Sequence, residues 1–177
     1  MDKKEITSAI ERNYGDFIAL VNGLSDTDFE RAPEGKWTPG KQLEHLAKSV
    51  RPLALALYLP ESVLRWRFGK ANRPSKTYDA LVEKYLAKIQ PGYVPKKQYI
   101  PRSVPISERD RWSQKLGRQV KTVVRHVEGM SEEQLDRMVA PHPAIGVLTL
   151  REMMYFTIYH AEHHSALVKR DQQILKA

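Results

Sequence analysis

Hydrophobic residues recur every three or four positions in four long stretches of the chain, which is the pattern of a helix that buries one face. The stretches cover residues 3–24, 38–59, 107–128 and 149–170. In the first of them the apolar positions are Ile6, Ile10, Tyr14, Phe17, Val21 and Leu24. Four such helices joined by loops predict an all-α antiparallel four-helix bundle.

Proline and capping residues punctuate this pattern. Thr38 is a good N-cap with Pro39 at the first helical position, and Pro52 is expected to kink the second helix. No stretch shows the strong alternation that predicts a strand. The chain has no internal repeat or linker, so we expect a single domain over residues 1–177.

An insertion of short helices and loop is expected between the second and third long helices. The pattern favours short helices over 61–68 and 78–89, followed by a segment, 90–106, that its prolines prevent from being one long helix. Long loops of this kind often cover binding sites. The segment could therefore close a pocket, or it could simply pack its tyrosines on the bundle.

Two histidines lie on the apolar face of the fourth helix. His160 and His164 are four residues apart, so their side chains are neighbours and could bind one metal ion. The alternative is that both are hydrogen-bonded core residues, because a buried imidazole needs partners for its ring nitrogens. His163 points toward the edge of this face, and His142, in the turn before the helix, could approach the site or solvent.

His45 lies on the second helix, opposite its apolar stripe. It shares that side with Gln42, Ser49, Leu53 and Ala56, beside a face of charged residues. Helical phase alone therefore does not nominate His45 as a ligand. This small, mixed face could line a pocket or could be a boundary of the core.

Composition limits the chemistry that the chain can offer. Among its 177 residues there is no cysteine, which excludes disulfides and thiolate ligands and leaves His, Asp or Glu to hold any metal. The N-terminus is charged and amphipathic, unlike a secretory signal, and no apolar run approaches the length of a membrane span. A cytoplasmic protein with no membrane partner is expected.

The net charge of +8 raises the question of nucleic-acid binding. The 29 Lys and Arg residues are, however, spread along the chain and mixed with 21 acidic residues. The densest basic segment, 65–76, contains Trp66 and Phe68, and we interpret it as a solvated connection with two buried aromatic residues. Trp37 is likewise expected to be a buried anchor. Nucleic acid is therefore not the favoured partner.

Two segments together resemble the signatures of the DinB / YfiT-like superfamily. They are KWTPGKQLEHLAKS, residues 36–49, and PHPAIGVLTLREMMYFTIYHAEHHSALVKR, residues 141–170. The resemblance implies a four-helix bundle in up-down-down-up order and one divalent metal ion, often zinc or nickel. Carried over residue by residue, it implies that His45, His160 and His164 hold the metal, with His163 and His142 in the outer shell or at the pocket rim.

The resemblance also implies an activity on a small-molecule substrate. Members of the superfamily are described as metal-dependent hydrolases or as S-transferases that use bacillithiol, mycothiol or related small thiols, and a homodimer is plausible. Three imidazoles leave a coordination position open, which is the pattern of catalytic rather than structural zinc. The alternative is a metal-binding or stress-response bundle without catalysis.

No carboxylate clearly joins these histidines. Glu162 follows His160 by two residues and points away, so the arrangement is not the H-E-x-x-H motif of a metalloprotease, and peptidase activity is disfavoured. Asp171, two turns beyond His164, is the nearest candidate for an outer-shell acid, or else belongs to a solvated terminus.

Overall fold

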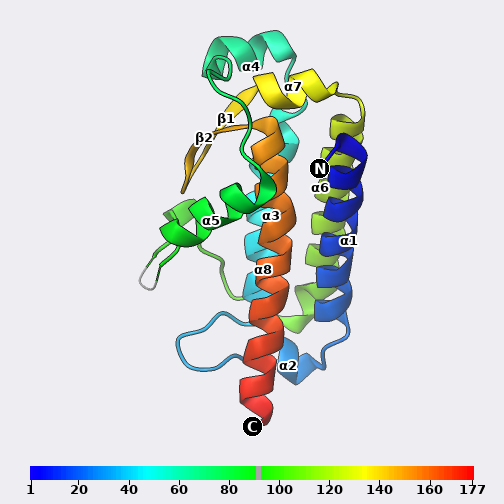
Figure 1. The fold of residues 1–177 in the computed structure, drawn as a ribbon. Helices are drawn as coiled ribbons and strands as arrows, with labels where there is room; N and C mark the ends of the chain where they lie inside the picture. The colour runs from blue at the N-terminus through cyan, green and yellow to red at the C-terminus, as the bar shows by residue number, and fades with distance from the viewer. Residues whose placement is uncertain (91–92) are drawn as a thin grey trace.

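Four long helices form the body of the protein in the computed structural model, which describes residues 1–90 and 93–177. They are α1 (Lys3–Asn22), α3 (Pro39–Ala56), α6 (Arg109–Glu128) and α8 (Leu150–Lys176). Helices α3 and α6 run in one direction and α1 and α8 in the other (Figure 1). The expected up-down-down-up bundle is confirmed, although α8 continues to Lys176 instead of ending near Arg170.

The long helices begin where their capping residues lie. The Thr38 side chain accepts a hydrogen bond from the N–H of Lys41, with Pro39 following it, as expected. Helix α8 begins with a capping box in which Thr149 and Glu152 each accept a hydrogen bond from the other's backbone N–H. None of the described helices is long and apolar enough to cross a membrane.

The insertion between α3 and α6 contains the two expected short helices, α4 (Glu61–Phe68) and α5 (Tyr78–Lys88). Helix α4 lies over the end of the bundle where α8 begins, and α5 packs against α8 (Figure 1). The proline-containing segment after α5 includes two short 3₁₀ turns, η1 (Lys97–Tyr99) and η2 (Ile106–Glu108). Pro91 and Gly92, which the expected loop includes, lie outside the described residues.

The remaining elements are short. Helices α2 (Asp26–Glu30) and α7 (Glu132–Arg137) follow α1 and α6, and an antiparallel hairpin of β1 (Val139–His142) and β2 (Gly146–Thr149) leads into α8. The sequence did not predict this hairpin. Its strands have four residues each and their burial does not alternate, so the period-two signal is missing.

The apolar stripes of the long helices meet in one core. Its largest fully buried side chains are Tyr14, Phe17, Phe29, Ile6, Ile10, Leu43, Leu46, Leu81, Leu116, Leu135, Leu148 and Met154. The expectation that Trp66 is buried is wrong, because its side chain is 85% exposed. Leu64 is the buried residue of α4. Trp66, two positions further along the helix, points to the opposite side.

Residues 99–104 are fastened to α3. The buried carboxylate of Glu44 accepts a hydrogen bond of 2.6 Å from the backbone N–H of Arg102, and the Lys48 ammonium donates to the carbonyl of Ile100 at 3.0 Å. The backbone at Val104 approaches α3 so closely at Gly40 that no side chain fits between them. This segment therefore lies against the start of α3.

We expect Gly40→Ala to destabilise the fold by about 1–3 kcal/mol, as overpacking does. The added Cβ would lie 2.8 Å from the Val104 carbonyl oxygen and 2.9 Å from the Phe29 ring. Gly15→Ala in α1 is the matched control, because its Cβ would meet nothing within 4 Å. It should gain roughly 0.5–1 kcal/mol. Urea denaturation measures both, and a Gly40→Ala variant as stable as the wild type would contradict this packing.

Candidate metal centre

Three buried histidines from two helices meet between α3 and α8. His45 comes from α3, and His160 and His164 come from successive turns of α8. The Nε2 atom of His160 lies 3.2 Å from Nε2 of His45 and 3.0 Å from Nε2 of His164. The helices bring together the three residues that the family resemblance implies as ligands.

Hydrogen bonds on the far side fix the orientation of two of the rings. Nδ1 of His45 donates to the carbonyl oxygen of Tyr99 at 2.8 Å, and Nδ1 of His164 donates to Oε1 of Gln42. Each proton therefore sits on Nδ1 and leaves the Nε2 lone pair facing the centre. Carbonyl and amide acceptors behind a metal-binding histidine serve the same purpose in known sites.

The third ring is held by packing. His160 stacks on Phe156 with ring centroids 4.8 Å apart, and its Nδ1 has no hydrogen-bond partner among the described residues. If Nε2 of His160 carries a proton, that one N–H cannot donate fully to the Nε2 lone pairs of both His45 and His164. A buried set of acceptors with too few donors is costly unless a cation sits among them.

The spacing suits such a cation. Nitrogen ligands lie about 2.0–2.1 Å from zinc, so two of them on a tetrahedral ion are about 3.3 Å apart. The measured separations of 3.0 and 3.2 Å are close to that value. Among the described residues, only His45, His160 and His164 form a group of three side chains able to share an ion.

Burial keeps these imidazoles neutral. Desolvation lowers the pKa of His45 and lowers the pKa of His160 and His164 well below the usual value, with neighbouring histidines adding to the effect for the last two. A neutral imidazole is the form that binds a metal. The site is therefore ready to bind an ion at neutral pH without first losing a proton from its rings.

A cavity of about 610 Å³ opens beside the three histidines. Gln42, Ser49 and Ala56, which share the small face of α3 with His45, line it, so that face borders a pocket. Tyr93 and Tyr99 of the proline-containing segment line it as well. The described part of this segment therefore borders the pocket through its tyrosines. The two alternatives, closing a pocket and packing tyrosines on the bundle, both describe part of its role.

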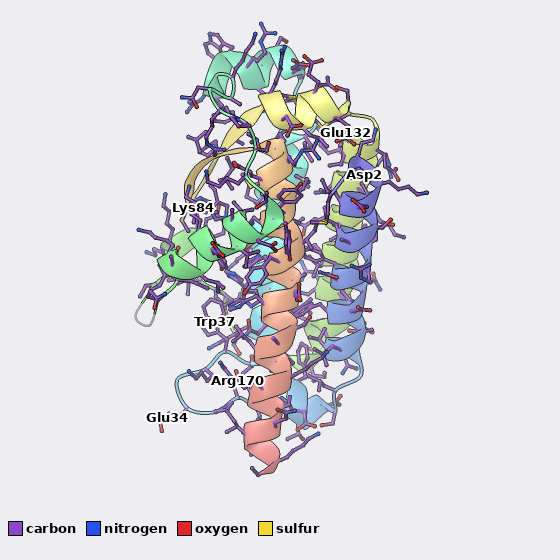
Figure 2. All side chains as sticks on the ribbon, in the orientation of Figure 1. Asp2, Glu34, Trp37, Lys84, Glu132 and Arg170 are labelled. Atoms are coloured by element: carbon purple, nitrogen blue, oxygen red, sulfur yellow. The ribbon has the colours of Figure 1, made fainter. Side chains whose placement is uncertain are left out.

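Trp37 differs from its expected role as a buried anchor. It is half-buried, lines the cavity, and its ring centroid lies 5.0 Å from that of His45. Trp37 lies near the middle of α8, and Arg170 lies closer to its C-terminal end (Figure 2). Arg170, which also lines the cavity, therefore marks its polar end.

His142 lies in the cavity wall, not among the converging ligands. Its Nδ1 accepts hydrogen bonds from the backbone N–H groups of Ala144 and Ile145 at 3.2 and 3.3 Å, inside the hairpin turn that Gly146 closes with a φ of +85°. Burial, helped by the Lys84 ammonium, lowers the pKa of His142 to about 4. The ring is neutral with its proton on Nε2, which makes His142 a fixed hydrogen-bond donor.

Two further candidates from the sequence line the cavity without joining the cluster. His163 is half-buried, with its ring centroid 5.4 Å from that of His164. Asp171 is buried within α8 instead of lying in a solvated terminus, and its carboxylate accepts hydrogen bonds from Arg170 at 2.6 and 2.8 Å. Tyr99 was missed because its contribution is a backbone carbonyl, which no residue type signals.

Comparison with known proteins agrees with the fold and its signatures. The family model described as the DinB superfamily matches residues 9–168. A solved structure, YfiT from Bacillus subtilis, described as a probable metal-dependent hydrolase with an unusual four-helix bundle topology, aligns with a TM-score of 0.66 and 15% identity over 98% of this chain and 87% of that one. No curated protein matches the sequence. The chain belongs to the DinB superfamily.

Proposed function

We propose that the protein is a metal-dependent hydrolase that acts on a small electrophilic substrate, with His45, His160 and His164 holding one divalent ion. The observation that carries the proposal is the convergence of three Nε2 atoms beside a cavity of about 610 Å³. Sites for small molecules usually have this volume. The description of Bacillus subtilis YfiT as a probable metal-dependent hydrolase supports it.

The three ligands leave room for substrate and water. A divalent ion held there would lower the pKa of a water molecule or a small thiol and so supply a nucleophile at neutral pH. Imidazole ligands suit zinc and nickel, which are our candidates for the ion. Glu162 is exposed and outside the site, so the arrangement remains unlike that of a metallopeptidase.

Transfer of a small thiol to the substrate is the second candidate. Lys36, Lys96 and Arg170 line the cavity and give it cationic side chains toward one end. These cationic side chains favour a co-substrate that carries carboxylates, as many low-molecular-weight thiols do. Both reactions would use the same three histidines and would differ in the nucleophile.

Metal removal is expected to abolish hydrolysis of p-nitrophenyl acetate, and zinc or nickel should restore it. His164→Gln should lower kcat/KM by more than about a hundredfold, because loss of even an outer partner of a ligand costs ten- to a hundredfold. His126→Gln is the control, since His126 packs on Tyr58 outside the site and donates to the Thr122 carbonyl. Assays with and without N-acetylcysteine distinguish hydrolysis from thiol transfer.

Two results would count against the proposal. Activity that survives removal of the metal would place the chemistry elsewhere. A tightly bound metal with no turnover of esters, amides or thiol acceptors would instead indicate the non-catalytic metal-binding bundle.

A further inference from the structure

The cavity continues well past the histidines, toward the end of the bundle that α4 covers. On α3 it follows the side that carries His45, through Ser49, Pro52, Leu53 and Ala56. On α8 it follows His160 back through Phe156, Met153 and Leu150. The two helices therefore form the long walls of one elongated space.

We call the part of the cavity beyond the histidines the apolar arm, defined by Leu53, Leu57, Leu64, Phe68, Leu150 and Met153. Leu64 and Leu150 are buried and close its far end. Leu150 lies ten positions before His160 on α8, so the space from the histidines to the far end of the apolar arm is about 15 Å long along the helix axis. That length exceeds what a small hydrolysable group would fill.

Charge is confined to the opposite end of the cavity. The charged residues among the described lining are Lys36, Lys96, Arg170 and Asp171. Lys36 precedes α3, Arg170 and Asp171 lie more than one turn beyond His164, and Lys96 precedes the turn that places Tyr99 on His45. The described lining of the apolar arm contains no charged side chain.

His142 supplies a polar contact between the two ends. Its ring packs on Phe156 at 4.2 Å between centroids, and Phe156 in turn stacks on His160. With Nδ1 occupied by two backbone N–H groups, its Nε2–H has no partner among the residues that the structure describes and can donate to an oxygen of a ligand. A molecule that reaches from the histidines into the apolar arm would pass this donor.

From this division we infer that the substrate carries an uncharged apolar tail that occupies the apolar arm, while its reactive polar group lies in the part of the cavity lined by the three histidines and His142. The inference names a substrate class for the proposed hydrolase, and it rests on that proposed function. The binding of the tail does not depend on turnover. An apolar wall without charge favours such a tail because each buried methylene contributes about 0.8 kcal/mol.

The test uses n-butanol, n-hexanol, n-octanol and n-decanol, titrated calorimetrically into the full-length protein as purified. Each added methylene should lower Kd about three- to fourfold until the chain fills the apolar arm. A wild-type protein whose Kd does not depend on chain length would overturn the inference.

Ala56→Phe is the blocking variant. Ala56 lies eleven residues after His45, close to three full turns, so its side chain has the same helical phase and is half-buried in the cavity wall. The phenyl ring should fill the apolar arm and remove the dependence on chain length while n-butanol binds as before. Ala87→Phe, on the exposed side of α5 and outside the cavity lining, is the control and should behave as the wild type.

The possible outcomes distinguish binding of the apolar tail from hydrolysis. Chain-length dependence that Ala56→Phe leaves intact would mean that alcohols bind elsewhere and would overturn the inference. Thermal unfolding followed by circular dichroism identifies a variant that fails to fold, and Leu53→Arg, which places a charge in the apolar arm, then provides the second test. A wild-type protein that binds the alcohols with this chain-length dependence but does not hydrolyse esters would refute the proposed function, and the binding of an apolar tail in the apolar arm would still be supported.

Discussion

Alanine in place of His160 should remove the bound metal, from about one equivalent in the wild type to less than a tenth of that. His160 lies at the centre of the proposed metal site, since its Nε2 is 3.2 Å from that of His45 and 3.0 Å from that of His164. Without His160, an ion would be held by only two nitrogens, from His45 and His164, and its coordination would be incomplete. The affinity should fall by more than about a hundredfold, because changes behind the ligands alone cost ten- to a hundredfold. Mass spectrometry of metal content after dialysis, with competition against a chelating dye, measures the change.

His163→Ala is the control for that experiment. His163 neighbours His164 in sequence and lines the cavity, yet its ring is not part of the converging group. It should retain about one equivalent of metal. A His160→Ala variant that still binds a full equivalent, or a wild-type protein that takes up neither zinc nor nickel, would show that the three histidines are structural.

The two candidate ligands on α8, His160 and His164, could be recognised from the sequence because they lie on one face of one helix. His45 could not, since α3 is buried on two sides and periodicity reports only the stronger one. Leu43, Leu46 and the rest of that stripe face the core, whereas the opposite side of α3 faces the cavity. Only the family signature placed His45 in the site.

Charged residues show the same limit on prediction. Glu44 and Glu152 lie off the apolar stripes of their helices, so the sequence places them on polar faces, but they are 2% and 0% exposed. Each is covered by a segment distant in sequence, which brings its own donors: the segment at Arg102 for Glu44, and the segment 73–76 for Glu152. Local pattern predicts elements, whereas the loops that fold over them decide which charges become buried.

Glu152 offers the sharpest test of that packing, and Glu152→Ala should destabilise the protein by about 3 kcal/mol. This is the lower end of the cost of removing one partner of a buried ion pair, because Glu152 is buried but Arg73 is 34% exposed. Its carboxylate accepts hydrogen bonds from both terminal nitrogens of Arg73, at 2.5 and 2.8 Å, and from the backbone N–H groups of Lys76 and Thr149. Alanine would remove the acceptor of the Lys76 and Thr149 N–H groups and leave the Arg73 guanidinium with the Pro74 carbonyl. The 73–76 segment would then keep only its Ser75 contacts to Asp136 and Thr149 among these hydrogen bonds. Urea denaturation followed by circular dichroism gives the change in the free energy of unfolding.

Glu133→Ala provides the matched control for the loss of Glu152. Glu133 also pairs with an arginine, Arg137, at 2.8 Å, but its side chain is 66% exposed and that of Arg137 is 68% exposed. An exposed pair of this kind contributes at most about 1 kcal/mol, so the control should be nearly neutral. Arg73→Ala in the Glu152→Ala background should add little, because the partner is already gone.

If Glu152→Ala cost no more than Glu133→Ala, the 73–76 segment would not be held by this carboxylate. The hydrogen bonds of Ser75 to Asp136 and Thr149 would then be the contacts that hold it.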